Sequence, residues 1–230
     1  MSVHPRQIRS FVRRAGRLTR AQQRALDELW PRYGLPPAEE AAAEQLDLPA
    51  IFGRTAPCVL EIGFGNGDAL VAMAAAMPEQ DFIGAEVHEP GVGHCLLAIE
   101  QRSLANVRLV MQDAVELLRD RLPPGSLAGI HLYFPDPWHK KRHHKRRLVQ
   151  PDFVALMASR LKPAGYFHVA TDWPDYAEHI EAVLAGEPLF ARTQQPAETH
   201  ARPLTRFEAR GQRLGHPTWE ACYVRRSATT

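Results

Sequence analysis

From residue 58 onward, short apolar runs alternate along the chain with longer segments of mixed character. Each short run is apolar on both faces, which is typical of strands in a parallel sheet covered on both sides by helices. The expected strands span residues 58–62, 82–87, 107–112, 129–134 and 165–171, with later candidates at 188–192 and 219–226. The expected helices span 68–77, 91–103, 114–121, 151–161 and 175–185. This order predicts an α/β fold.

The segment before residue 58 has a different character. Six arginines and no acid lie in the first twenty residues, as in a mitochondrial presequence or in an arm that contacts RNA phosphates. We favour the arm, because Thr19 and Gln22 form a capping-box spacing that begins a helix. The stretch "PRYGLPP" at 31–37 then interrupts the chain. We therefore expect a basic arm and helical extension over 1–50 and the main domain over 51–230.

The composition favours a folded protein in a reducing compartment. Hydrophobic residues make up 45% of the 230 residues, enough for a sizeable core. Cys58, Cys95 and Cys222 lie far apart without a CxxC pair, so neither a disulfide framework nor a thiolate zinc site is favoured. No apolar run approaches the ~20 residues that a membrane span requires. We expect a cytoplasmic protein with no membrane partner.

An acidic residue stands at the end of each of the first five predicted strands. Carboxyl ends of parallel strands meet at one edge of the sheet, where ligands bind. Any single acid is also explained by the helix dipole, which favours acids near helix N-termini, but five in succession indicate a site. These acids are Glu61, Glu86, Asp113, Asp136 and Asp172.

The first predicted strand leads into a glycine turn, Gly63, Gly65 and Gly67, where the backbone can approach a ligand closely. A dinucleotide fingerprint requires a sixth-position glycine, and Asp68 stands there instead. The pattern therefore favours a ligand without phosphates over NAD, and an unliganded tight turn is the alternative.

S-adenosylmethionine is such a ligand, because it has a ribose, an adenine, an ammonium and a sulfonium. Glu86 follows Gly67 by nineteen residues, close to the ~20 expected for a carboxylate that bonds ribose hydroxyls. Asp113 is a candidate for the adenine amino group, and Glu61 for the cationic amino-acid end. We expect this molecule as the cofactor.

Asp136 lies between Pro135 and Pro137, which fix φ and supply no N–H, so the carboxylate sits in a rigid, non-helical turn. Residues 139–147 follow with six Lys or Arg, three His and no acid. Such a run can grip phosphates beside a site of chemistry, and a solvated face or a localisation signal is the alternative. The candidate phosphate contacts are Lys140, Lys141, Arg142, Lys145, Arg146 and Arg147.

Other residues near this run have two interpretations each. Trp138 can stack on a base or simply pack. His139 and His143 are four residues apart, but without Cys or acid nearby we expect no metal site. Thr205 and Glu208 have capping-box spacing, while a Glu can also accept two hydrogen bonds from the N1–H and amino group of guanine. Asp172 likewise either caps the helix that begins near residue 174 or faces the substrate.

The chain resembles the bacterial tRNA (guanine-N7)-methyltransferase family. The matching stretches are "IRSFVRRAGRLTRAQQRAL", "LEIGFGNG", "GAEVHEPGVG", "FPDPWHKKRHHKRR", "ATDW" and "RPLTRFEARGQRLGH", from residue 8 to residue 216. The resemblance implies a Rossmann-like class I methyltransferase fold, a seven-stranded, mostly parallel sheet with helices on both faces and the last strand antiparallel. It also implies methyl transfer from S-adenosylmethionine to N7 of guanine 46 in the tRNA variable loop, with tRNA as partner.

The resemblance assigns roles residue by residue. Arg206 departs from the family, which more often has Lys there, and a guanidinium is a fork where an ammonium is a point charge. We expect a monomer, with a homodimer as the alternative. The implied donor-binding acids are Glu61, Glu86, Asp113 and Asp136, and the implied substrate contacts are Lys140, Asp172, Thr205, Arg206, Phe207 and Glu208.

The chemistry so implied sets the role of Asp136. Guanine N7 has an in-plane lone pair and no proton, so methyl transfer needs no general base. The product ring is a cation, which a nearby carboxylate stabilises and positions. Two other classes stay open: a nicotinamide-dependent oxidoreductase, disfavoured by the glycine pattern, and a non-catalytic RNA-binding protein, disfavoured by the donor-site acids.

Overall fold

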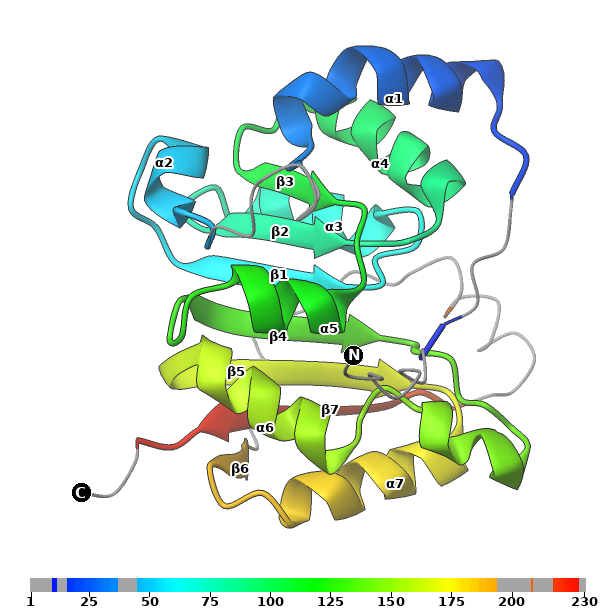
Figure 1. The fold of residues 1–230 in the computed structure, drawn as a ribbon, viewed down its shortest axis with the longest axis vertical. Helices are drawn as coiled ribbons and strands as arrows, with labels where there is room; N and C mark the ends of the chain where they lie inside the picture. Colours follow the sequence, from blue (N-terminus) through cyan, green and yellow to red (C-terminus); the bar gives the residue numbers. More distant parts are fainter. Residues whose placement is uncertain (1–9, 12–15, 37–44, 194–207, 209–216, 228–230) are drawn as a thin grey trace, which may run out of the picture.

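The computed structural model describes residues 10–11, 16–36, 45–193, 208 and 217–227. One seven-stranded sheet runs through the molecule in the order β3-β2-β1-β4-β5-β7-β6 (Figure 1). The strands are β1 Cys58–Ile62, β2 Asp81–Ala85, β3 Val107–Val110, β4 Leu127–Tyr133, β5 Leu161–Thr171, β6 Phe190–Thr193 and β7 Trp219–Arg225.

The pairing of these strands confirms the predicted sheet. β3, β2, β1, β4 and β5 are parallel neighbours, and β7 inserts antiparallel between β5 and β6. The strand order reverses between β1 and β4, because the chain first adds β2 and β3 on one side and then β4 and β5 on the other. In sheets of this kind the ligand crevice lies at that reversal, beyond the carboxyl ends of the strands.

Helices cover both faces of the sheet, and each face has its own apolar core. α1, α3 and α4 pack on one face, over side chains such as Val59 and Phe82. α6 and α7 pack on the other, over Leu60 and Phe167 (Figure 1). The helices are α1 Arg20–Tyr33, α2 Leu48–Phe52, α3 Asp68–Ala76, α4 Glu89–Gln101, α5 Ala114–Glu116, η1 Leu117–Arg121, η2 Lys141–Arg146, α6 Pro151–Arg160 and α7 Pro174–Ala185.

The sequence-based boundaries differ from these in several places. The helix expected over 114–121 is a short α-turn, α5, that widens into the π-helix η1. The basic run, where no helix was expected, forms the 3₁₀-helix η2. Residue 31 does not end α1, because the Gly34 N–H still bonds the Trp30 carbonyl oxygen at 2.7 Å and closes the last turn beyond the proline.

The N-terminal extension packs on the sheet domain. The capping box at the start of α1 is confirmed, with Thr19 and Gln22 each bonded to the other's backbone. The Gln22 side chain also donates to the Pro90 carbonyl oxygen at 3.0 Å on α4, and Tyr33 donates to Glu100 at 2.5 Å. The division expected between residues 50 and 51 falls inside α2.

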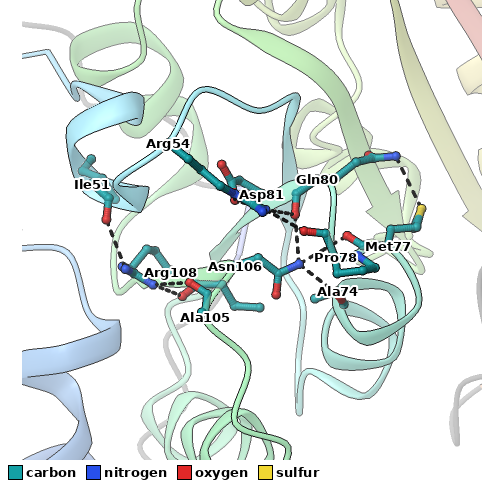
Figure 2. A network of polar contacts seen from close by, with 11 residues as sticks. Ile51, Arg54, Ala74, Met77, Pro78, Gln80, Asp81, Ala105, Asn106 and Arg108 are labelled. Carbon is teal, nitrogen blue, oxygen red and sulfur yellow. Dashed lines mark hydrogen bonds and ion pairs between the residues drawn. The ribbon is translucent and has the colours of Figure 1, made fainter.

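A polar network ties together the amino-terminal ends of β2 and β3, at the sheet edge opposite the expected crevice (Figure 2). Asn106 donates through Nδ2 to the carbonyl oxygens of Ala74 and Gln80 at 3.0 and 2.9 Å. Asp81 is buried and pairs with Arg54 at 2.7 Å. The network satisfies the buried polar groups at this end of the sheet and fixes the loop that starts β2.

Candidate active site

The glycine turn after β1 has the backbone geometry that its residues predict. Gly63, Gly65 and Gly67 have φ angles of 68°, 59° and 82°, in the left-handed region that side chains disfavour. A Cβ on Gly67 would also lie 2.4 Å from the Cys95 sulfur of α4. A Cβ on Gly63 or Gly65 would meet nothing within 4 Å, so both face open space beside the strand ends. The turn therefore exposes bare backbone at the crevice.

Glu86 ties this turn to the end of β2. Its Oε2 accepts from the Gly65 N–H at 2.9 Å, and its Oε1 accepts from the N–H groups of Val87 and His88 at 2.7 and 3.0 Å. A carboxylate offers about four lone-pair positions, so these three bonds leave capacity for one more donor. A ribose hydroxyl is a donor of that kind.

A pocket of about 240 Å³ lies beyond the carboxyl ends of β1, β2, β3 and β4. We call it the donor pocket, after the methyl donor expected from the sequence. It brings together Gly63, Glu86, Asp113 and Asp136, which lie up to 73 residues apart along the chain. Glu61 is not among its lining residues, and that side chain is buried. The remaining walls are mainly apolar, from residues such as Ile62, Ala85, Leu132 and Leu148, and suit the flat face of a nucleobase.

Asp113 has a structural bond as well as a place in the pocket. Its Oδ1 accepts from the Val115 N–H at 2.8 Å and so caps α5. The other carboxylate oxygen of Asp113, or a neighbouring side chain, is therefore left for the expected contact with an adenine amino group. Gln112 is such a neighbour, and it lines the same pocket.

Asp136 sits in a turn that carries backbone strain at both ends. Phe134 and Trp138 each have φ of 51°, a left-handed conformation that costs a side-chain-bearing residue of order 1 kcal/mol or more. The Phe134 N–H bonds the Ala170 carbonyl oxygen of β5 at 2.8 Å, which anchors one end. Between these points Asp136 is exposed at the rim of the donor pocket. Such strain clusters at functional sites, where the surrounding structure holds it in place.

The basic run divides into exposed and buried cations. Lys140, Lys141, Arg142 and Lys145 are exposed and form what we call the cationic ridge. Desolvation, and after it the positive charges of Arg142, Arg146, Lys140 and Lys145, lower the pKa of His143 below its ordinary value. The ridge follows the Asp136 turn directly, so free positive charge lies beside the donor pocket.

Arg147 departs from the sequence-based expectation. Its side chain is 2% exposed and pairs with Asp175 of α7, while its Nε donates to the Pro137 carbonyl oxygen at 3.0 Å. It also lies 4.9 Å from the ring centre of Tyr176. A guanidinium held in this way is not presented to solvent, so the burial of Arg147 gives the expected phosphate contact no support.

Arg146 and Trp138 contact the N-terminal arm. The Arg146 guanidinium lies 3.9 Å from the Trp138 ring centre and donates to the Phe11 carbonyl oxygen at 3.4 Å. Trp138 Nε1 donates to the Ser10 carbonyl oxygen at 3.0 Å. Ser10 and Phe11 both line the donor pocket, which no local sequence pattern indicated.

The remaining expected substrate residues are only partly described. Thr205, Arg206 and Phe207 lie outside the described residues, and Glu208 is buried. Asp172 is half-buried after β5, and α7 begins with Trp173 as N-cap and has no side-chain cap bond. The capping interpretation of Asp172 therefore finds no support.

Neither a metal site nor a membrane span is found among the residues that the structure describes. Across the described ranges, no group of three or more His, Cys, Asp or Glu side chains could hold a metal ion. Within the same part of the chain, no helix combines the length and apolarity needed to cross a bilayer. All three cysteines are buried free thiols.

The sheet order, the glycine turn and the acids at the strand ends define a class I methyltransferase. Residues 55–221 match a family model described as "Putative methyltransferase". A 16S rRNA (adenine(1408)-N(1))-methyltransferase from Catenulisporales acidiphilia, solved with the cosubstrate S-adenosylmethionine, has the same fold. Its TM-score is 0.53 and its identity 16%, over 85% of this chain and 94% of that chain.

Two curated relatives are much more similar. The tRNA (guanine-N(7)-)-methyltransferase of Cupriavidus necator is 53% identical over 231 residues, 98% of this chain and 86% of the relative. Its namesake from Alkalilimnicola ehrlichii is 55% identical over 226 residues, 96% of this chain and 94% of the relative. The chain belongs to the tRNA (guanine-N7)-methyltransferase family.

Proposed function

We propose that this protein transfers the methyl group of S-adenosylmethionine to N7 of guanine 46 in the tRNA variable loop. The observation that carries the proposal is the position of Asp136. Its exposed carboxylate stands at the rim of an acid-lined pocket, in a strained turn that leads directly into the cationic ridge. The names of the curated relatives support guanine N7 as the acceptor.

The donor pocket fits the proposed methyl donor. S-adenosylmethionine supplies a methyl group bound to a sulfonium, and it has no phosphate. The pocket offers carboxylates and bare glycine backbone, which suit ammonium, sulfonium and hydroxyl groups. Glu86 holds the ribose hydroxyls, Asp113 lies toward the adenine, and Glu61 acts on the cationic amino-acid end, directly or through water.

Asp136 acts on charge rather than on a proton. Guanine N7 carries a lone pair and no hydrogen, so the transfer requires no base. Methylation makes the purine ring cationic, and a carboxylate at the rim stabilises that charge as it develops. The same carboxylate helps to orient the base toward the methyl group.

The cationic ridge holds the RNA while the base reaches the pocket. Lys141, Arg142 and Lys145 are exposed and contact phosphates, which carry no sequence information but position the substrate. Arg146, between the ridge and the arm, reaches a phosphate only if its contact with Phe11 opens. The proposed contacts with the target nucleotide are Lys140, Asp172, Thr205, Arg206, Phe207 and Glu208.

The direct test is incubation of the purified protein with unmodified tRNA and S-adenosylmethionine carrying a labelled methyl group. Mapping of the product should place 7-methylguanosine at position 46, and a tRNA with adenine at that position is the matched control. Label elsewhere, or no label although the donor binds, contradicts the proposal. A parallel titration with NAD separates the oxidoreductase alternative, which requires NAD to bind in place of the methyl donor.

The proposal includes a cytoplasmic monomer. Three buried thiols suit a reducing compartment, where cysteines stay unpaired. Light scattering at micromolar concentration should give the mass of one chain, 25.8 kDa. A mass twice that value favours the homodimer instead.

A further inference from the structure

Gln112 follows β3 and stands directly before Asp113. The chain bends at this residue, past the end of β3 at Val110. Gln112 is one of the lining residues of the donor pocket.

The Gln112 amide is not accounted for by the fold. Its Oε1 is buried, and within the described residues this oxygen accepts no hydrogen bond. A buried acceptor without a partner is costly, and such groups in native proteins call for a functional explanation. Position in the donor pocket suggests that a ligand supplies the partner.

The chemistry of the amide indicates which part of the ligand. Among the described lining residues, Gln112 has the only carboxamide, a group that donates and accepts side by side. Adenine presents the same pair in reverse, an N6 amino donor next to a ring-nitrogen acceptor, and Gln bonds adenine in this bidentate way elsewhere. Asp113 accepts only, and one of its oxygens already caps α5.

We infer that Gln112 is a donor-binding residue that reads the amino edge of the adenine, together with Asp113. The inference rests on the proposed use of S-adenosylmethionine. It adds a specificity contact to the donor-binding acids, because an amide distinguishes adenine from a base without the 6-amino group.

The test uses Gln112→Leu, which keeps the side chain's size and removes both polar groups. Calorimetric titration with S-adenosylhomocysteine should show a Kd about five- to twentyfold higher than that of the parent, the scale of one or two lost hydrogen bonds. The melting temperature should stay equal or rise, because the variant no longer buries an unpaired oxygen. Gln101→Leu, at the exposed end of α4, is the matched control and should leave the Kd unchanged.

An S-adenosylhomocysteine analogue with purine in place of adenine completes a cycle. Loss of the 6-amino group should weaken binding to the parent more than binding to Gln112→Leu. Equal weakening in both proteins, or an unchanged Kd in Gln112→Leu, overturns the inference. Absence of binding to the parent contradicts the proposed function itself, so the two failures are distinguishable without tRNA.

Discussion

The guanidinium of Arg147 holds the carbonyl oxygen of Pro137 at 3.0 Å, one residue after Asp136. The same guanidinium pairs with Asp175 on α7. A buried cation thus joins the strained turn that carries Asp136 to a helix of the sheet domain.

Arg147→Ala should lower the free energy of unfolding by about 2–3 kcal/mol, because the Pro137 carbonyl and Asp175 lose a charged donor. Urea unfolding monitored by circular dichroism measures this change. The salt dependence of tRNA affinity should remain that of the parent, since the side chain does not face solvent. A flatter slope would show that Arg147 contacts phosphate after all.

The cationic ridge is tested by a triple variant in which Lys141, Arg142 and Lys145 are all replaced by Ala. The slope of log tRNA affinity against log salt concentration should become less negative by about 2 to 3, which is nearly one for each lost phosphate contact. Filter binding over a range of salt concentrations measures the slope. Lys162→Ala, exposed at the opposite edge of the sheet, serves as control. If the triple variant keeps the parent's slope, the ridge is only a solvated face.

Glu86→Gln should weaken S-adenosylmethionine binding by about 1–3 kcal/mol, because a neutral amide accepts less well from ribose and from the Gly65 N–H. Calorimetric titration gives the affinity. Glu89→Gln, three residues later and exposed, should bind as the parent does. Parent-like affinity in Glu86→Gln would leave Glu86 as a brace for the glycine turn alone.

Asp136→Ala should lower the single-turnover rate at saturating tRNA and donor by ~10²-fold, the scale of one lost electrostatic stabiliser. Its tRNA affinity should change little, because uniform binding and transition-state stabilisation are separable. Lys145→Ala should show the opposite pattern, with weaker tRNA binding and a nearly intact saturated rate. Donor saturation must be verified for both variants. A parent-like rate in Asp136→Ala would reduce "FPDP" to a structural turn.

The pKa of Asp175 lies below its ordinary value because of the hydrogen bond from Arg147. The folded protein then binds this proton less readily than the unfolded chain does. The stabilising effect is present above the unfolded pKa of about 3.9 and disappears as pH falls through the lower folded value. Urea unfolding is measured at decreasing pH from about pH 5 downward. Over this range the free energy of unfolding should fall more for the parent than for Asp175→Asn. Parallel curves for the two proteins would contradict this coupling.

Local patterns in the chain determined the order of strands and helices and the edge of the sheet where the site lies. Apolar periodicity is a property of neighbouring residues, and so is the capping box at Thr19 and Gln22. The acids at the strand ends followed from the same logic, because parallel strands align their carboxyl ends. The sequence alone therefore places Asp113 and Asp136 near each other.

Only the tertiary structure decided which side chains of like charge are exposed and which are buried. Lys145 and Arg147 stand two residues apart in an unbroken basic run, yet one is exposed and the other is buried against α7. Gln112 gave no signal in the sequence, because its importance lies in an acceptor that the fold buries in the pocket. The burial of a side chain and the partner of a buried group depend on segments far away along the chain. Local residue patterns therefore do not predict them.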